Sequence, residues 1–334
     1  MEQTQPHDRR PPVAVSSGSI LIGVDLGSHH IRTGAVDENG KLLDFQREPK
    51  QGDTAAGSSR SIADQLLAAV GQMIAAHSGA GRIAAIGVAL PGLIHHETHR
   101  IVNLPIAPGL VGLDLYTEFK NAFGVPIYFE NNANAAAFAE MTFGVAKGES
   151  DWLYLHIGSG VGAGLVLDGK LRRGKSGFAG EIGHINIDPE GIECPCGSFG
   201  CLETVASAPN IVRRTRDRLR KDATSSLSRL GAVRGFTYDD VIAAAKTGDD
   251  LAKMMLQRTG FFIGRAVAGV INLLNLSMVA VGGSPAGRAF LVPAIIEETR
   301  RRGFPAVCDD CRIVAAELDG EAGVIGAALL AAKE

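Results

Sequence analysis

The chain has 334 residues, of which 46% are hydrophobic and 21% are charged, a balance typical of a globular protein with about two domains. A net charge of −3 argues against a general nucleic-acid-binding surface, and no apolar stretch is long enough to predict a membrane span. The first 19 residues are polar and proline-rich and lack the apolar core of a signal peptide. They predict a disordered tail on a cytoplasmic protein.

The first half of the chain opens with a predicted meander of three strands, because short apolar runs alternate with turn residues such as Asn39-Gly40. A helix with apolar residues at helical spacing follows, and then two buried strands and a second helix. In chain order we expect strands at 19–25, 31–36 and 41–45, a helix at 60–78, strands at 84–90 and 126–130, and a helix at 132–143.

The second half begins with the same pattern of strand, glycine turn, strand and hairpin, over residues 152–174. The segment GAVDENGKL, from Gly34, matches GLVLDGKL, from Gly164, which indicates an internal duplication, although a match this short also arises by chance. Strands then alternate with helices, so the predicted fold class is α/β. The expected elements are helices at 206–221, 237–245 and 249–275, a strand at 278–283, a helix from 286, a strand at 311–318 and a helix at 321–332.

The two glycine turns are candidate phosphate sites, because a tight turn between strands exposes backbone N–H groups. Asp25, an acid at a strand end, is able to hold Mg²⁺ through water. A third glycine site lies at Gly282-Gly283-Ser284. Glycine-rich hairpins are common, and the alternative for the third site is a strand-to-helix turn that binds nothing.

The cysteines indicate a metal site rather than a disulfide, because five is an odd number and cytosolic thiols stay reduced. Three thiols and one imidazole form a complete tetrahedral set for a structural zinc ion. The four predicted ligands are His184, Cys194, Cys196 and Cys201. The alternative is a group of buried free thiols. Cys308 and Cys311 are expected to be bystanders, or at most an oxidation-prone dithiol.

Other charged residues allow a functional and a plain interpretation. Glu181 and Glu203 bracket the cysteines and could accept hydrogen bonds from sugar hydroxyls, or they could simply be solvated. The basic segment from Arg213 to Lys221 is expected to be a solvated helix face. His95, His96 and His99 are expected in a loop.

Several motifs together resemble the ROK family, whose members include repressors and sugar kinases. The run FAGEIGH followed by CPCGSFGCLE resembles the signature of that family, and VDLGS and HIGSGVGAGLV resemble its two phosphate loops. FENNANAAAFAE resembles the segment with a sugar ligand and the catalytic aspartate, and GEAGVIGAALLA resembles the closing helix. The resemblance covers residues 20–334.

The resemblance implies two actin-like ATPase (ribonuclease H-like) domains, with sugar and ATP in the cleft between them. The small N-terminal domain would span residues 20–139 and be completed by 318–334, and the larger domain would span 140–317. The implied reaction transfers the γ-phosphate of Mg·ATP to a hexose hydroxyl, in a homodimer or homotetramer. Glucose is the expected substrate, with N-acetylhexosamines as alternatives.

The resemblance also assigns residue roles. The sugar contacts would be Asn131, Glu181, His184 and Glu203, with Asn103 as a further one, and His184 would use one ring nitrogen for zinc and the other for the sugar. The nucleotide contacts would be Asp25, Gly27, Ser28, Gly158, Ser159, Gly160, Gly282 and Gly283.

Two departures from the family pattern bear on activity. Asn132 stands where the family has its catalytic aspartate, and an amide cannot accept the proton of the sugar hydroxyl. The first phosphate loop carries Ser28, His29 and His30 in place of glycine, threonine and then lysine or asparagine. The sequence does not distinguish a natural loss from an engineered substitution at position 132.

Three functions therefore remain for comparison. The first is an ATP-dependent, glucokinase-like hexose kinase with reduced or lost activity, and the second is a sugar-binding sensor or scaffold. The third, a transcriptional repressor, is disfavoured because it needs a DNA-binding domain ahead of the first strand, where only 19 residues stand.

Overall fold

A computed structural model describes residues 16–51, 59–221, 224–233 and 235–333. The chain divides into two compact units. The N-terminal unit comprises Met1–Lys147, Leu171–Ala179 and Gly320–Glu334, and the C-terminal unit comprises Gly148–Lys170 and Gly180–Asp319. Of the predicted disordered tail, residues 1–15 lie outside the described residues, and Ser19 already begins the first strand. No helix of the described part is long and apolar enough to cross a membrane.

The N-terminal unit is built on a five-stranded sheet with the order β3-β2-β1-β4-β7. The first three strands form an antiparallel meander, and β1, β4 and β7 run parallel. The strands are β1 (Ser19–Leu26), β2 (His30–Asp37), β3 (Leu42–Pro49), β4 (Arg82–Leu90) and β7 (Ile127–Asn131), and the small pair β5 (Leu93–Ile94) and β6 (Ile101–Asn103) lies apart. The helices are α1 (Ser59–His77), α2 (Leu115–Phe123), α3 (Asn132–Thr142) and α11 (Ala322–Lys333).

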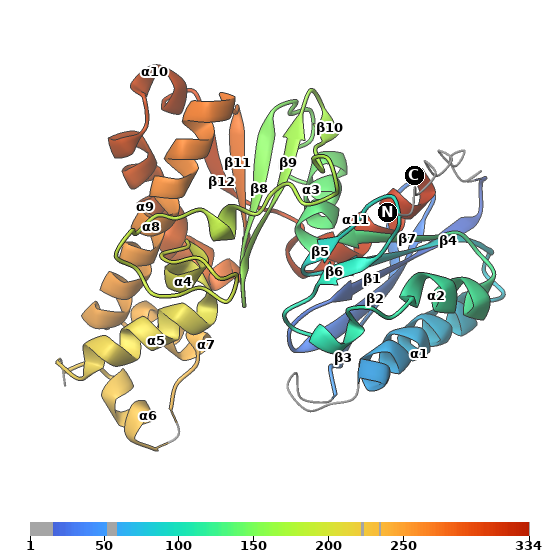
Figure 1. Ribbon diagram of the computed structural model, residues 1–334, viewed down its shortest axis with the longest axis horizontal. Coiled ribbons are helices and arrows are strands. Elements are labelled where there is room, and N and C mark those ends of the chain that lie inside the picture. The colour runs from blue at the N-terminus through green and yellow to red at the C-terminus, as the bar shows by residue number, and fades with distance from the viewer. Residues whose placement is uncertain (1–15, 52–58, 222–223, 234, 334) are drawn as a thin grey trace, which may run out of the picture. The chain divides into compact units, whose positions relative to one another are not determined.

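Helices cover both faces of this sheet (Figure 1), which explains why β1 is mainly apolar and why its eight residues are all buried. Side chains alternate between the faces along a strand. Ile20, Ile22 and Val24 therefore pack in the core cluster that includes α1 and α2, whereas Leu21 packs in the cluster with α3 and α11.

Glycines allow α11 to lie directly on the sheet. A Cβ atom on Gly23 of β1 would lie 2.0 Å from the carbonyl oxygen of Val324, and one on Gly87 of β4 would lie 1.9 Å from that of Ala327. Any side chain at these positions would push the helix away from the sheet. The last segment of the chain thus completes the core of the first unit.

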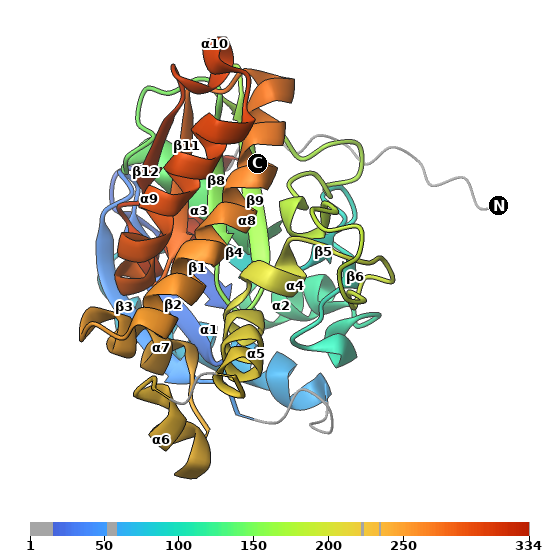
Figure 2. The ribbon, with the colours of Figure 1, turned by 90° about the vertical axis from the view of Figure 1, so that its left-hand side faces the viewer.

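The C-terminal unit has a sheet with the order β10-β9-β8-β11-β12. Its long helices α8 and α9 run side by side (Figure 2) and pack on one sheet face through a second apolar cluster. The strands are β8 (Trp152–Ile157), β9 (Val161–Leu167), β10 (Lys170–Leu171), β11 (Met278–Gly283) and β12 (Arg312–Ala315). The helices are α4 (Glu203–Ala206), α5 (Ala208–Leu219), α6 (Leu227–Val233), α7 (Tyr238–Lys246), α8 (Asp250–Leu274), α9 (Pro285–Arg302) and α10 (Pro305–Cys308).

The two sheets share one design. In each, three antiparallel strands come first in the chain and the two parallel strands that complete the sheet come later. This confirms the predicted recurrence of the opening hairpin unit in the second half. The structure differs from the sequence prediction at α2 and α6, which were not predicted, and at 206–221, where extended Ser207 separates α4 from α5.

Candidate functional site

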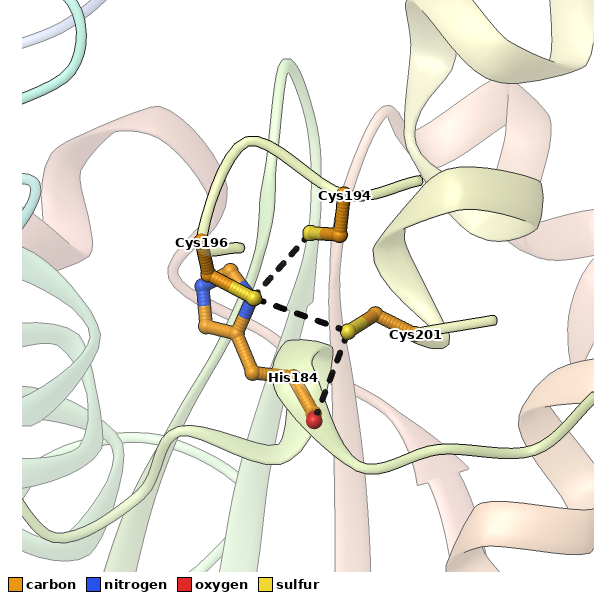
Figure 3. A group of neighbouring side chains, drawn as sticks. All are labelled: His184, Cys194, Cys196 and Cys201. Carbon is orange, nitrogen blue, oxygen red and sulfur yellow. Dashed lines mark hydrogen bonds between the residues drawn. The ribbon is translucent and has the colours of Figure 1, made fainter. Parts of the chain in front are cut away.

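Four predicted metal ligands come together in the C-terminal unit. His184 ends a short 3₁₀ turn, and the three cysteines lie on the segment Asn186–Cys201, called here the cysteine loop (Figure 3). Two isolated bridges, Asn186–Cys201 and Glu193–Phe199, close this loop on itself. The ligand atoms of the four residues all lie within 4.8 Å of one another.

The spacing of these atoms fits one tetrahedral ion. Sγ of Cys194 lies 3.6 Å from Nδ1 of His184, and Sγ of Cys196 lies 3.7 Å from Sγ of Cys201. Zinc–sulfur bonds of about 2.3 Å place neighbouring sulfurs about 3.8 Å apart, so both distances suit edges of a zinc tetrahedron. Nδ1 of His184 is therefore the ring nitrogen that faces the thiols, whereas Nε2 lies near Glu181.

The three thiols have different acidities without a metal. The backbone N–H of Ser198 lowers the pKa of Cys196 to about 7, whereas burial raises the pKa of Cys194 to about 12 and also raises that of Cys201. Two of the thiols are thus buried and the third ionises readily. A cation bound among them would stabilise all three as thiolates.

Two carboxylates lie beside this cluster. Nε2 of His184 is 3.8 Å from Oε2 of Glu181, and Oε2 of Glu203 accepts a 2.8 Å hydrogen bond from the backbone N–H of Val161. Burial raises the pKa of Glu181, Glu203 raises it further, and His184 opposes the rise. Glu203 is thus held by a backbone N–H, whereas the side chain of Glu181 is still 38% exposed.

The second glycine turn, residues 157–161, lies against Glu203. A Cβ atom on Gly160 would approach Oε2 of Glu203 to 2.8 Å, and the N–H of Gly158 donates to the carbonyl of Gly160. In the same unit Gly283 pairs with Ile157 in the sheet and has φ +104°, with no room for a side chain. The predicted glycine sites at Gly158–Gly160 and Gly282–Gly283 thus lie at the same end of neighbouring strands β8 and β11.

In the N-terminal unit, Asn131 and Asn132 follow β7 directly. Oδ1 of Asn131 caps α3 by accepting from the N–H groups of Ala133 and Asn134, and its Nδ2 donates to the carbonyl of Gly92 at 3.0 Å. Asn132 is half-buried at the first helical position, and its side chain has no hydrogen-bond partner among the described residues.

Asn103 also lies next to Gly92. The carbonyl oxygen of Asn103 would lie 2.2 Å from a Cβ atom on Gly92, and the exposed Asn103 pairs with Leu93 in the small sheet. The structure therefore brings the two predicted sugar-site asparagines of the N-terminal unit, Asn103 and Asn131, beside one glycine. The other three predicted contacts, Glu181, His184 and Glu203, belong to the C-terminal unit.

A buried ion pair supports the start of α3. Glu130 is 4% exposed, accepts from Nε of Arg173 at 2.6 Å, and also accepts from the backbone N–H of Asn131 and from Nδ2 of Asn134. Sequence reasoning missed this network because Arg173 is 43 residues away. The acid next to Asn131 in FENNAN was the only signal.

The first glycine turn, residues 26–30, is tight, with the N–H of Gly27 donating to the carbonyl of His30 at 2.8 Å. The predicted magnesium contact Asp25 is buried and forms a 2.7 Å ion pair with Arg32. Burial raises the pKa of Asp25 and Arg32 opposes this rise. Arg32 was not among the predicted site residues, and Ser28 lies in the turn as expected.

Three side predictions have clear outcomes. The basic segment after Arg213 is only partly a solvated face, because Arg213 and Arg214 donate to backbone carbonyls of Thr204 and Val205. His95 and His96 follow β5 in a loop, as predicted, and are half-buried there. Cys308 and Cys311 are both buried, and burial raises the pKa of each.

A comparison with known proteins decides the family. The model of the ROK family matches residues 21–334. The chain belongs to the ROK family. It is 33% identical to a glucokinase of Halalkalibacterium halodurans, over 91% of this chain and 92% of that enzyme.

Two solved structures of family members are similar over nearly the whole chain. A glucokinase from Streptomyces griseus, in complex with glucose and AMPPNP, has a TM-score of 0.81 and 30% identity, covering 93% of this chain and 98% of that one. A ROK transcriptional regulator, homologous to the MLC protein of E. coli, has a TM-score of 0.83 and 30% identity, covering 94% of this chain and 78% of that one. The fold is the actin-like ATPase type of α/β fold found in ROK kinases, and the relatives include both kinases and repressors.

Proposed function

We propose that this ROK protein is an ATP-dependent hexose kinase of the glucokinase type, in which Asn132 weakens phosphoryl transfer without preventing sugar binding. The observation that carries the proposal is the contact between Glu203 and the second glycine turn in the C-terminal unit. Glu203 accepts the N–H of Val161, and Gly160 approaches the same carboxylate. Transfer of a phosphoryl group to a sugar requires acceptors for the sugar hydroxyls next to a turn that can bind phosphate.

Sugar binding in this proposal uses anionic acceptors held in fixed positions. Glu203 is fixed by the N–H of Val161, and Glu181 faces Nε2 of His184. A site that hydrogen-bonds each hydroxyl rejects a sugar that lacks one, because its own polar groups would be left unpaired. Glucose is the proposed ligand, and N-acetylhexosamines are the next candidates.

The donor set of the cysteine loop fits zinc, which we propose as a structural ion. His184, Cys194, Cys196 and Cys201 fill a tetrahedron, so no position would remain open for catalysis. The ion would lock His184 in the tautomer that keeps Nε2 available for the sugar. Folding of the cysteine loop would then depend on the metal.

Phosphoryl transfer would proceed without a general base at position 132. Asn132 is neutral at every pH, so the sugar hydroxyl would lose its proton to water or phosphate as the bond to phosphorus forms. Loss of a general base slows a reaction by about 10²–10⁴-fold. Positioning of sugar and Mg·ATP by the remaining residues supplies the residual rate.

A second candidate function is a sugar sensor without phosphoryl transfer. Asn132 and the similarity to the ROK transcriptional regulator favour it. The two functions share sugar binding and differ in nucleotide binding, which makes them separable by experiment.

The deciding experiment measures sugar and nucleotide binding by calorimetry, and ADP release in a coupled assay with Mg·ATP and a panel of hexoses. We expect slow, hexose-dependent ADP release and tighter binding of glucose than of fructose. Glu203→Gln should abolish sugar binding, whereas Glu190→Gln, an exposed acid of the cysteine loop, should not. Sugar binding with no detectable Mg·ATP binding would contradict the kinase function and support the sugar-sensor function.

A further inference from the structure

The first glycine turn lacks a cationic side chain at the place where its sequence departs from the family pattern. His30 stands at the position of the family's lysine or asparagine. Nδ1 of His30 lies 3.2 Å from Nη2 of Arg47, and because a guanidinium only donates hydrogen bonds, that nitrogen must be an unprotonated acceptor. His30 is therefore neutral, and its pKa is lowered by burial and by Arg47 and Arg32.

Arg32 brings a permanent positive charge to the same turn. It is the direct cross-strand partner of Asp25 in the β1–β2 ladder, and its Nη1 lies 2.7 Å from Oδ2 of that acid. Nη1 also lies 3.2 Å from the position that a Cβ atom on Gly27 would take. The guanidinium group thus lies against the turn itself, and a side chain at position 27 would require it to shift by a few tenths of an ångström.

The ion pair leaves part of each partner unused. Oδ1 of Asp25 is buried without a hydrogen-bond partner, and the side chain of Asp25 is 9% exposed, against 24% for Arg32. Among the described residues, Nη2 and Nε of Arg32 have no acceptor. A buried carboxylate that holds one edge of a guanidinium group fixes the direction of the remaining donors, which suit the fork of two phosphate oxygens.

We propose that Arg32 is a phosphate-binding residue that contacts the terminal phosphates of the nucleotide at the first glycine turn, with Asp25 as its positioning residue. The inference rests on the proposed function, because it names a further ligand of the same nucleotide. Arg32 supplies there the cation that His30 does not. An ion pair with a purely structural role would contribute to folding and leave nucleotide affinity unchanged.

The test compares Arg32→Gln with Arg47→Gln, which removes a charge from the neighbouring strand position without touching Asp25. Calorimetry would measure the Kd values of Mg·ATP, Mg·ADP, AMP and glucose for both variants and for the parent. We expect Arg32→Gln to raise the Kd values of Mg·ATP and Mg·ADP by about tenfold or more. AMP and glucose should change by less than about twofold, and Arg47→Gln should bind all four ligands as the parent does.

The outcomes separate this proposal from the proposed function. A parent protein that binds glucose but no Mg·ATP would overturn both. A parent that binds Mg·ATP, with an Arg32→Gln variant that binds it equally well, would overturn only the role of Arg32. If Arg32→Gln fails to fold, Arg32→Lys keeps a cation beside Asp25 but loses the fork. A threefold or greater loss of Mg·ATP affinity with unchanged AMP affinity then supports the proposal, and unchanged Mg·ATP affinity overturns it.

Discussion

Asn131 and Asn132 are adjacent amides in very different surroundings. All the polar atoms of Asn131 have structural partners, since its side chain caps α3 and donates to Gly92. Asn132 has none among the described residues, and its side chain is half-buried. A substitution at position 132 therefore changes chemistry with little effect on folding, which makes it the informative place for a single change.

Asn132→Asp should restore a proton acceptor at the start of α3. We expect kcat for the preferred hexose to rise by about 10²-fold or more, equivalent to about 3 kcal/mol of activation free energy. Sugar affinity should change little, because Glu181 and Glu203 are unaltered. A coupled ADP-release assay and calorimetry measure the two quantities.

The pH profile provides a second readout of the same change. The Asn132→Asp variant should gain an acidic limb as the new carboxylate protonates, whereas Asn132 contributes none in the parent. Normal sugar binding with unchanged kcat in the variant would show that the defect lies elsewhere, with the first glycine turn as the next place to examine.

At this scale the sequence predicted that the four candidate metal ligands lie together, because four strong ligands within one short segment leave few arrangements. Arg32 and Arg173 were missed because each pairs with its acid across a sheet or from a distant segment, and such pairings depend on the fold. The use of Asn131 as a helix cap was also missed, although an asparagine just before a helix is a recognisable local signal.

At the scale of elements, the cysteine loop is expected to depend on its metal. Protein purified without added zinc should contain about one equivalent per chain. Cys196→Ala should lower the zinc content, lower the melting temperature and abolish glucose binding, since His184 and Glu203 flank the loop. Metal analysis, thermal unfolding and calorimetry test these points.

Cys308→Ser is the matched control, because it removes a thiol outside the cluster and should leave one equivalent of zinc. Unaltered glucose affinity in a metal-free protein would contradict the role given to the ion.

Helices α8 and α9 are joined by a buried acid. Glu298 of α9 has a side chain only 1% exposed and is paired with Arg265 of α8 and with Arg301 and Arg302 of its own helix. Burial by itself would raise the pKa of Glu298, but hydrogen bonds from the three arginines outweigh it and hold the pKa below the ordinary 4.5. The carboxylate is therefore more stable in the folded than in the unfolded chain.

This shift predicts an acid-dependent loss of stability. Because the pKa of Glu298 is lower in the folded than in the unfolded chain, the carboxylate contributes its full stabilisation above the unfolded pKa of about 4.5. That stabilisation is lost as the pH falls through the folded pKa. Glu298→Gln should cost about 1–3 kcal/mol of unfolding free energy at pH 7, and the difference from the parent should shrink below about pH 4.5.

Urea denaturation across this pH range measures the effect of Glu298→Gln. Glu297→Gln, at the exposed neighbouring position, should show no such dependence. An equal loss of stability for Glu298→Gln at every pH would mean that packing, not charge, is responsible.

The boundaries of helices and strands were predicted well where the pattern of apolar residues was strong. They were predicted poorly where that pattern was weak. The long apolar helix α8 and the buried strands were expected from their periodicity. The split between α4 and α5 was missed, although Ser207 and the proline that follows it in the first turn of α5 are recognisable signals for the start of a helix. Helix α2 was missed, although its Asp114 cap and left-handed Gly124 at the other end are recognisable signals.

For the molecule as a whole, the recurrence of one sheet design in both halves followed from the hairpin motifs, and the family match is consistent with it. The membership of Leu171–Ala179 in the N-terminal unit did not follow, since nothing in that short segment marks it as a return. The glycines at the sheet–helix contacts allow distant parts of the chain to pack closely, because Gly87 and Ala327 are far apart in sequence and in contact in the fold.

Gly87→Ala should therefore be destabilising at a site where alanine usually is not. The added methyl group would meet the carbonyl oxygen of Ala327 at 1.9 Å, which forces α11 away from the sheet and should cost about 1–3 kcal/mol or more. Gly71→Ala in α1 is the control, since the nearest atom to its added methyl group is a side-chain atom of Phe123 at 4.0 Å, and alanine there should stabilise the helix by up to about 1 kcal/mol. Chemical denaturation compares the two, and equal stabilities would contradict the close packing.

The dependence of the N-terminal sheet on α11 also has a consequence for the order of events on the ribosome. The strands of that sheet are synthesised before the C-terminal unit, yet the residues from Gly320 onward that help to cover one of their faces are synthesised after it. At about 5–20 residues per second, translation from Lys147 to Glu334 takes roughly 10–40 s. During that interval the nascent chain carries a sheet with one apolar face that α3 covers only in part. The C-terminal unit, which lacks only Leu171–Ala179 from an otherwise continuous segment, is then free to fold before the unit that precedes it.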